Sequence, residues 1–567
     1  MQEAPLDAQP AGGQFPAATL HTPRLTLQHV DDAARATLWE QAFPSAVWRS
    51  VIGDRAVSLE VEGEDISLVG ARSGIRREHG AIPSGRRALR PAELEEDWLW
   101  LEGEVRRVRW DLEDTAELPP VTVVMPTYRR EDDALSQVRR FLAMDLVTEV
   151  IVVDQGETLE DEPRFERLLV DEERLRLVTQ SNLGGSGGYA RGMVEAASNP
   201  AAAVLFSDDD AVLSGESLHR MVTFQALATR PTILGTPLFS SKKAQRLLAH
   251  AETVDRRTFH WRPTDLTGGP MDLRGTTPVD WDALSPSAPA TYTGWWGTLF
   301  PPGTAAELGL PLPLFLKWDD AEYGLRATAR GYDHALLPGT AVHHPPWNAH
   351  STQMSWSARL LHRNRLAIAA GHGAGRGVIA SSFVHQCKHV LAGHLLTAEL
   401  WEAGVDEFRA GPSAWLGSDL DRARGEGERI VTAWHAENDL PGPLTPTRTS
   451  PRPFTVALGH ALLRLATPDR APRVVLEVPS KKVRWNTTLG ADALLITRGG
   501  APLEAYRVRG SRMRRALARV IASHLDLTWR WSTLQESYRR ALPRHATAEA
   551  WSAQFAASSP APPTGRS

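Results

Sequence analysis

Val121-Thr-Val-Val-Met-Pro-Thr127 is an apolar run that ends in polar residues, and it opens a regular pattern. A second apolar run, Glu149-Val-Ile-Val-Val-Asp154, follows after a helical stretch, and a third is Ala201-Ala-Ala-Val-Leu-Phe-Ser207. Short apolar runs that alternate with helical stretches predict parallel strands joined by crossover helices. In such sheets ligands bind beyond the carboxyl ends of the strands. We therefore expect a binding site at the sheet edge where these runs end.

The acidic triplet Asp208-Asp209-Asp210 stands directly after the third run. In an extended segment the two alternate carboxylates can point the same way while the middle one points elsewhere. Hard oxygen ligands suit Mg²⁺ or Mn²⁺, which could bridge them to a diphosphate and neutralise the charge that develops as it leaves. An exposed acidic turn is the commoner explanation of such a triplet alone. Its position after a buried strand favours the metal site.

A glycine-rich segment, Asn182-Leu-Gly-Gly-Ser-Gly-Gly188, runs into a helical pattern. Glycines let backbone N–H groups approach a phosphate or sugar closely, and a helix start favours an anion. The segment is neither a Walker loop nor the dinucleotide fingerprint, because the flanking residues do not fit. We expect Gly184 and Gly185 to contact substrate; a flexible turn is the alternative.

Trp318-Asp319-Asp320-Ala-Glu322 places three carboxylates within four positions, next to a tryptophan. One of them could be a general base that takes a proton from an acceptor hydroxyl, with its pKa raised by burial and by neighbouring acids. Simple capping of a helix is the alternative. Upstream, Trp295 and Trp296 could hold sugar rings or form a packing corner. Downstream, one of the two histidines at His343-His344 could complete the metal site.

The bulk properties exclude several classes of protein. The chain has 567 residues, of which 42% are hydrophobic, and a formal net charge of −5. This predicts roughly two to four domains and gives no sign of a nucleic-acid partner. The single cysteine, Cys387, excludes an internal disulfide, and no window approaches the roughly 20 apolar residues of a membrane span. Because the first residues lack a secretory signal, we expect a cytoplasmic protein.

Changes of pattern divide the chain into five segments. We expect disordered ends at 1–18 and 558–567, a small β-sandwich at 19–115, and the α/β domain at 116–355. A mainly helical domain would occupy 356–557, where the helical periodicity covers Ser357–Ala370, Ile379–Ala403, Asp419–Glu437 and Ser511–Arg540. Short strand-like pieces at Arg473–Val478 and Ala493–Thr497 interrupt these helices.

These motifs together resemble the family-2 inverting glycosyltransferases of the GT-A fold. The residues that carry the resemblance include Pro126-Thr-Tyr-Arg-Arg130 and Val153-Asp-Gln-Gly156, together with the glycine-rich segment, the acidic triplet, the paired tryptophans, Trp318-Asp-Asp-Ala-Glu322 and His344. The order of the modules and the string Gln41-Ala-Phe-Pro-Ser-Ala-Val-Trp-Arg49 are similar to the polymerising galactofuranosyltransferases of actinobacterial cell-wall galactan synthesis. The resemblance implies an α/β protein whose GT-A domain stands between an N-terminal β-sandwich and a mainly helical C-terminal region.

The resemblance also implies an activity and roles for individual residues. Galactofuranose would move from UDP-galactofuranose to a hydroxyl of a growing glycan, with Asp320 as the base. Asp208, Asp210 and His344 would hold Mn²⁺ or Mg²⁺. The expected substrate contacts are Arg130, Gln155, Asn182, Gly184, Gly185, Asp208, Trp295, Trp296, Asp319 and Trp347. Two departures from the family pattern, Ser207 and Pro345-Pro346, concern the acceptor contacts more than the metal.

The expected partners follow from the same resemblance. Family members of this architecture extend a glycan linked to polyprenyl phosphate, which implies peripheral contact with the inner face of the cell membrane. The arginine-rich segment Tyr506–His524 is compatible with anionic lipid, and a solvated helix face or a contact in a homo-oligomer is the alternative. Three other functions stay open: a family-2 transferase with another donor such as UDP-glucose or dTDP-rhamnose, a non-catalytic glycan-binding protein, and a nucleotidyltransferase.

Overall fold

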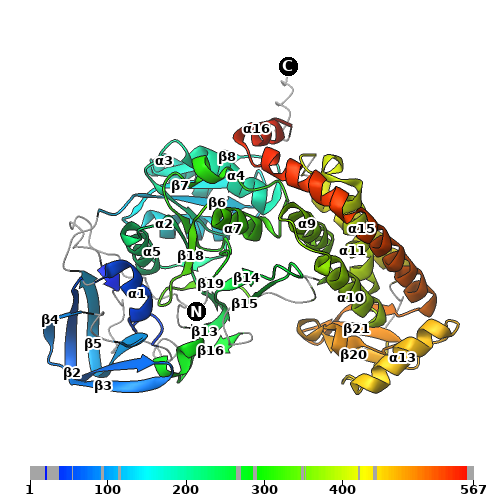
Figure 1. Cartoon of the computed structure of the whole chain (residues 1–567), viewed down its shortest axis with the longest axis horizontal. Helices are drawn as coiled ribbons and strands as arrows, with labels where there is room; N and C mark the ends of the chain where they lie inside the picture. The colour runs from blue at the N-terminus through cyan, green and yellow to red at the C-terminus, as the bar shows by residue number, and fades with distance from the viewer. Residues whose placement is uncertain are drawn as a thin grey trace.

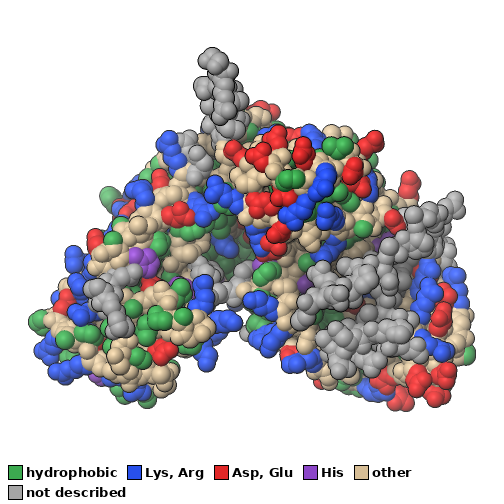
Figure 2. Space-filling view, turned by 180° about the vertical axis from the view of Figure 1, so that it is seen from behind, with side chains coloured by type: hydrophobic (Ala, Val, Ile, Leu, Met, Phe, Trp, Pro, Cys, Tyr) green, Lys and Arg blue, Asp and Glu red, His purple; other side chains and the backbone are tan. Residues whose placement is uncertain are grey.

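The protein, seen in a computed structural model, has three parts that follow one another in the sequence (Figure 1). An N-terminal sheet (blue) is followed by a central α/β domain (cyan to green) and a helical C-terminal region (olive to red). The space-filling view shows a hollow between the two lower lobes, beneath the central domain (Figure 2). The structure describes residues 19–21, 38–53, 55–90, 95–112, 117–263, 270–284, 290–346, 350, 353–418, 420, 422–438 and 444–557.

The N-terminal part is a five-stranded antiparallel sheet with helix α1 (Ser45–Ile52) beside it. Its strands are β1 (Thr19–His21), β5 (Trp98–Leu112), β2 (Val57–Arg72) and β3 (Ile75–Ala81), in that order, with β4 (Gly85–Leu89) also paired to β2. Two alternating runs that are separate in the sequence, Ala56–Val61 and Ile66–Gly70, contribute to the single strand β2, because its ladder with β5 continues across register shifts near Gly63. A β-sandwich needs two packed sheets, and the described residues of this part form one.

The central domain is built on a seven-stranded sheet of order β18-β11-β17-β9-β6-β7-β8. The predicted strands are confirmed as β6 (Val121–Thr127), β7 (Val147–Asp154) and β9 (Ala203–Phe206), and they are parallel. The sequence did not indicate β8 (Leu175–Thr179), β11 (Thr232–Gly235), β17 (Thr298–Phe300) or β18 (Asp333–Leu336). The helices of this domain are α2 (Glu131–Leu142), α3 (Pro163–Asp171), α4 (Gly184–Ala196), α5 (Gly215–Leu227), α6 (Thr304–Leu308) and α7 (Asp319–Ala329).

A second sheet lies at the edge where the central strands end, and it brings distant segments together. Its strands are β10 (Val212–Leu213), β19 (Val342–His344), β12 (Leu238–Ser240), β13 (Lys243–Ala249) and β16 (Met271–Asp272). Strand β10 follows the acidic triplet and pairs with β19, with Val212 opposite His343. A hairpin of β14 (Glu252–Val254) and β15 (Trp261–Pro263) and the 3-10 segment η2 (Pro278–Leu284) complete this region.

The glycine-rich segment is a helix rather than a loop, since α4 begins at Gly184. Its glycines allow close packing on the sheet. A Cβ added at Gly192 would lie 2.1 Å from Cγ1 of Val124, and one added at Gly188 would lie 2.5 Å from Cβ of Pro126. Both neighbours belong to strand β6. Gly188 and Gly192 therefore serve the contact between helix and strand, and the helix start at Gly184 leaves a flexible turn unsupported.

The C-terminal region contains the helices α9 (Ser357–Gly371), α10 (Gly377–Leu391), α11 (Leu395–Ala410), α12 (Arg422–Asn438), α13 (Phe454–Ala466), α15 (Gly510–His545) and α16 (Ala548–Ala557). The predicted helical stretches are all present, but Ile379–Ala403 is two helices because Gly393, with φ +78°, interrupts it. A small sheet consists of β20 (Val475–Pro479), β21 (Ala493–Arg498) and β22 (Ala501–Arg507). Its strands β20 and β21 correspond to the two predicted strands.

The C-terminal helices share a hydrophobic core with the central domain. Trp318 and Leu325, at the start of α7 and within it, pack in one cluster with Leu366, Phe408 and Tyr538 from α9, α11 and α15. The last helix returns to the central domain, where Nε1 of Trp551 donates to the carbonyl of Pro311 at 2.7 Å. Within the described part of the chain, none of the helices combines the length and the apolar character that crossing a bilayer requires.

Candidate active site

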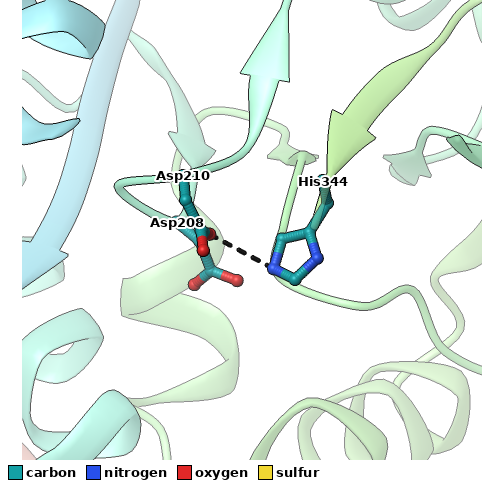
Figure 3. A group of neighbouring side chains, drawn as sticks. All are labelled: Asp208, Asp210 and His344. Atoms are coloured by element: carbon teal, nitrogen blue, oxygen red, sulfur yellow. Dashed lines mark ion pairs between the residues drawn. The ribbon is translucent and has the colours of Figure 1, made fainter. Parts of the chain in front are cut away.

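Asp208, Asp210 and His344 lie together at the edge of the central sheet (Figure 3). One ligand atom from each lies within 4.8 Å of the others, and no second such group of acidic, histidine or cysteine side chains occurs among the described residues. Nε2 of His344 is 3.2 Å from Oδ1 of Asp210. Nδ1 of His344 donates to the carbonyl of Pro345 at 2.6 Å, which directs Nε2 toward the acids. Two carboxylates and an imidazole oriented in this way fit Mn²⁺ or Mg²⁺.

The side chain of Asp208 is held by a tyrosine that the sequence did not single out. The hydroxyl of Tyr189 lies 2.8 Å from Oδ1 of Asp208 and 3.0 Å from the carbonyl oxygen of Trp295. Burial raises the pKa of Asp208, and the hydrogen bond from Tyr189 opposes this shift. The only signal in the sequence was that Tyr189 follows the glycine-rich segment directly.

The middle carboxylate of the triplet, Asp209, is not one of the three candidate metal ligands and binds strand β6 instead. Oδ2 of Asp209 accepts from Oγ1 of Thr127 at 2.7 Å, which ties the triplet to strand β6. Burial raises the pKa of Asp209 to about 7. Burial also acts on Asp210, but His344 and Arg130 outweigh it and hold the pKa of Asp210 down at about 2. The two carboxylates therefore differ in how easily they lose a proton.

Arg130, an expected substrate contact, bridges the acids. Its Nη1 lies 3.1 Å from Oδ1 of Asp209 and 2.7 Å from Oδ2 of Asp210. The arginine side chain remains partly exposed. It is therefore a cation next to the candidate metal ligands, where it could turn toward a diphosphate.

Gln155 and Asn182 hold the start of helix α4. Oε1 of Gln155 accepts from the backbone N–H of Leu183 at 2.9 Å, and its Nε2 donates to the carbonyl of Gly184 at 3.1 Å. Oδ1 of Asn182 accepts from the N–H of Gly184 at 3.0 Å. Gly185 faces the acids, because Oδ2 of Asp319 would be 3.7 Å from a Cβ at this position. The structure thus gives Gln155 and Asn182 positioning contacts and leaves Gly185 next to the site.

The three carboxylates at the start of α7 divide into one structural group and two that remain available. Buried Glu322 pairs with Nη2 of Arg326 at 2.7 Å, and Arg326 and His372 together outweigh burial and lower its pKa to about 2. Burial raises the pKa of Asp319, and the charge of Asp320 raises it further. Burial likewise raises the pKa of Asp320, with a further contribution from Asp208. Asp320 is the more exposed of this pair, which favours it as the group that meets a substrate.

The aromatic residues occupy different environments. Trp295 is buried against Tyr189 and Phe206, with ring centroids 5.1 and 5.3 Å apart, so it packs as a corner. Trp296 is half-buried over Gly294, and its Nε1 donates to the carbonyl of Thr236 at 3.3 Å. Trp347 lies outside the described residues.

Trp261, in β15, is an aromatic residue near the acids that no motif in the sequence indicated. It is 38% exposed and lies 5.1 Å, between ring centroids, from Trp318, which directly precedes Asp319. The hairpin β14–β15 therefore places an accessible aromatic face beside the start of α7.

Residues 119–367 match the family described as Glycosyltransferase like family 2. With the mixed seven-stranded sheet and the acidic triplet at its edge, this match makes the protein a glycosyltransferase of the GT-A class. The galactofuranosyltransferase GlfT2 of Mycobacterium tuberculosis is 31% identical over 465 residues, 76% of this chain and 72% of the relative. GlfT2 of Mycolicibacterium smegmatis is 30% identical over 565 residues, 90% of this chain and 87% of the relative. The chain belongs to the galactofuranosyltransferases of glycosyltransferase family 2.

The chain is also similar to a relative that matches over fewer residues and to a solved structure of low sequence identity. The galactofuranosyltransferase GlfT1 of Mycobacterium tuberculosis is 25% identical over 229 residues, 40% of this chain and 70% of the relative. The solved structure of GalNAc-T7 with UDP, GalNAc and Mn²⁺ has a TM-score of 0.34 at 11% identity, covering 47% of this chain and 52% of that chain.

Proposed function

We propose that the enzyme transfers galactofuranose from UDP-galactofuranose to a hydroxyl of a growing cell-wall glycan, with inversion of the anomeric carbon. The observation that carries this proposal is the convergence of two acidic groups at one sheet edge. Asp208, Asp210 and His344 form a candidate metal site, and the charge of Asp208 acts on the carboxyl of Asp320. The likeness to both GlfT2 proteins along most of the chain supports the choice of sugar.

The proposed mechanism is a single in-line displacement. Mn²⁺ or Mg²⁺, held by Asp208, Asp210 and His344, would neutralise the charge on the departing diphosphate. Tyr189 orients Asp208 through its hydroxyl, and Arg130 supplies a further positive charge beside the acids. Asp320 accepts the proton of the acceptor hydroxyl, and its raised pKa makes it a stronger base than an exposed aspartate.

The first experiment measures UDP release by purified protein with Mn²⁺ or Mg²⁺ and a short galactofuranosyl acceptor. UDP-galactofuranose, UDP-galactopyranose, UDP-glucose and dTDP-rhamnose are offered in parallel. We expect acceptor-dependent release from UDP-galactofuranose that Asp320→Asn lowers at least 100-fold, since general bases contribute about 10²–10⁴. Asp171→Asn, a change of an exposed aspartate in α3, is the matched control and should leave the rate unchanged.

Each other outcome points to a different function. Release of the nucleotide from another donor would support the proposed mechanism but show that the enzyme transfers a different sugar. Glycan binding without release of any nucleotide would support a non-catalytic glycan-binding protein, and release of pyrophosphate would support a nucleotidyltransferase. Full activity of Asp320→Asn would show that Asp320 is not the base and would favour Asp319 in that role.

We further propose that the acceptor is lipid-linked and that the C-terminal lobe contacts the anionic inner face of the cell membrane. Residues 448–505 carry nine Lys and Arg against four Asp and Glu, a net charge of +5 in a chain of net charge −5. Helix α13, within this segment, exposes the apolar side chains of Phe454, Val456, Leu462 and Leu463. This lobe is at the lower left of Figure 2, where Lys and Arg side chains border hydrophobic ones. Basic and apolar side chains together are what an anionic bilayer surface attracts.

This surface differs from the arginine-rich segment that the sequence suggested. Several arginines of Tyr506–His524 are engaged within the protein. Arg512 pairs with Glu437 at 2.8 Å, and Arg514 donates to the carbonyls of Leu465 and Thr467, both at 3.0 Å. We therefore place the membrane contact at α13.

Vesicle sedimentation tests this placement. The protein should bind vesicles that contain phosphatidylglycerol more strongly than pure phosphatidylcholine vesicles, and salt should weaken the binding. The double change Phe454→Ser and Leu463→Ser should reduce it, whereas Val170→Ser, at an exposed apolar residue of α3, should not. Equal binding by the double variant, or loss of self-association on gel filtration instead, would overturn the membrane placement.

A further inference from the structure

The residues immediately before α7 have an unusual backbone. Phe315, Lys317 and Trp318 have φ values of 70°, 69° and 74°, in the left-handed region that non-glycine residues seldom adopt. Such conformations persist only where the surroundings hold them, and they concentrate at functional sites. This segment leads directly into Asp319 and Asp320. Whatever holds it therefore also decides where the two carboxylates lie.

One side chain of helix α9 holds the segment. The amide Nδ2 of Asn364 donates to the carbonyls of Leu314, Leu316 and Lys317, each at 3.0 Å. Asn364 is fully buried, so its amide depends on these protein partners for its hydrogen bonds.

The orientation of that amide is defined by a second residue. Nε of Arg363 donates to Oδ1 of Asn364 at 3.0 Å, and Nη1 of Arg363 pairs with Oε2 of Glu407 at 3.0 Å. A donor faces the amide oxygen and three acceptors face the amide nitrogen, so a flipped amide would lose every one of these contacts. Asn364 thus has a single satisfied orientation.

The opposite side of the same segment contacts helix α4. The carbonyl of Phe315 accepts from the N–H of Ser186 at 3.1 Å, and it lies so close to Gly184 that a Cβ there would be 2.0 Å away. The segment is therefore fixed between α4, which carries Tyr189, and α9. This arrangement links the candidate base to the candidate metal site through a short set of contacts.

We propose that Asn364 is a positioning residue for the transfer reaction. It holds the left-handed segment 315–318 so that α7 begins with Asp319 and Asp320 directed at the site. This rests on the proposed function, in which Asp320 is the base. It also gives the C-terminal helices, to which Asn364 belongs, a part in catalysis beyond packing.

Two substitutions separate positioning from stability. Asn364→Leu keeps the size and removes the amide, and Asn364→Asp keeps the oxygen that Arg363 contacts and removes the donor. Asn438→Leu is the matched control, because Asn438 is a buried amide whose Nδ2 donates to the carbonyl of Trp434 at 2.7 Å, within α12. We expect both changes at Asn364 to lower kcat about 100-fold, the scale of a misplacement of about 1 Å. The KM for the donor and the affinity for UDP with Mn²⁺ should stay within about two-fold, and the control should keep its kcat.

The remaining outcomes overturn the proposal. Unchanged kcat in a folded Asn364 variant would show that segment 315–318 keeps its active conformation without the hydrogen bonds of Asn364. A loss of UDP affinity as large as the loss of kcat would show general disruption of the site. Should both Asn364 variants, and the milder Asn364→Ser, fail to fold while Asn438→Leu folds, Asn364 serves folding alone. An inactive Asp320→Asn beside a fully active Asn364→Leu would refute this inference and leave the proposed function standing.

Discussion

The hydroxyl of Tyr189 lies 2.8 Å from Oδ1 of Asp208, so helix α4 is tied to the candidate metal site by one hydrogen bond. The same hydroxyl reaches the carbonyl of Trp295 at 3.0 Å. A helix that begins in a glycine-rich segment therefore orients a carboxylate across the sheet. The glycines matter because they let α4 approach strand β6 closely enough for this contact.

Tyr189→Phe is expected to weaken Mn²⁺ binding about 10-fold or more, the scale seen when a group that orients a metal ligand is removed. Titration with Mn²⁺, followed by calorimetry or electron paramagnetic resonance, measures this. Tyr332→Phe is the matched control, because its hydroxyl pairs with the carboxylate of Glu307 at 2.6 Å away from the candidate metal ligands. Equal affinity of Tyr189→Phe and the control would contradict the orienting role.

Removing the metal should abolish transfer. EDTA is expected to reduce UDP release to background, and added Mn²⁺ or Mg²⁺ should restore it. His344→Ala should raise the metal concentration needed for half-maximal activity, because one of three protein ligands is lost. His460→Ala, at an exposed histidine of α13, should leave the metal requirement as it is. Activity in EDTA at the original rate would exclude the metal.

The transfer rate should depend on pH through Asp320. A base works only when ionised, and burial raises the pKa of Asp320 above the ordinary value of about 3.9. The rate at saturating substrate should therefore rise with pH through this raised pKa and level off above it. A rate that stays constant down to pH 4.5 would contradict a buried aspartate as the base.

Asp319→Asn should stabilise the fold at neutral pH. A carboxyl whose pKa is raised by folding costs nothing at low pH, where it is protonated in both states. The cost begins above the unfolded pKa, near 4, and is complete above the folded pKa. Thermal unfolding should therefore show a gain at pH 8 that disappears near pH 3, at about 1.4 kcal/mol per unit of pKa shift. Asp171→Asn should show no such pH-dependent gain. An equal gain in both variants would show that the stabilisation does not come from the buried carboxyl of Asp319.

Gly192→Ala should destabilise the protein by about 1–3 kcal/mol, because the added methyl would lie 2.1 Å from Cγ1 of Val124 in the sheet. Gly425→Ala, in α12, has open space around its Cα and should be neutral or slightly stabilising. Denaturant unfolding of both variants measures the difference. A neutral Gly192→Ala would mean that α4 can move away from β6 at no cost.

The local pattern of the sequence was enough to predict strands β6, β7 and β9, the long C-terminal helices and the acidic residues at both ends of the site. These features depend on neighbours in the chain: an apolar run, its polar end and a helical repeat all appear within about twenty residues. The resemblance to family-2 glycosyltransferases then named His344 as a partner of the aspartates. Local pattern also misled, since the runs Ala56–Val61 and Ile66–Gly70 contribute to one strand, β2.

Other features were decided by contacts between residues far apart in the chain. The pairing of β10 with β19 brings His344 to 3.2 Å from Asp210, and no repeat or spacing in the sequence encodes that approach. Arg326 makes Glu322 a structural carboxylate and so leaves Asp319 and Asp320 for chemistry. Asn364, on a helix of another region, holds the backbone on which those two residues depend. A side chain acquires such a role from the groups that folding places around it, because burial and hydrogen bonding depend on distance in space and not on separation along the chain.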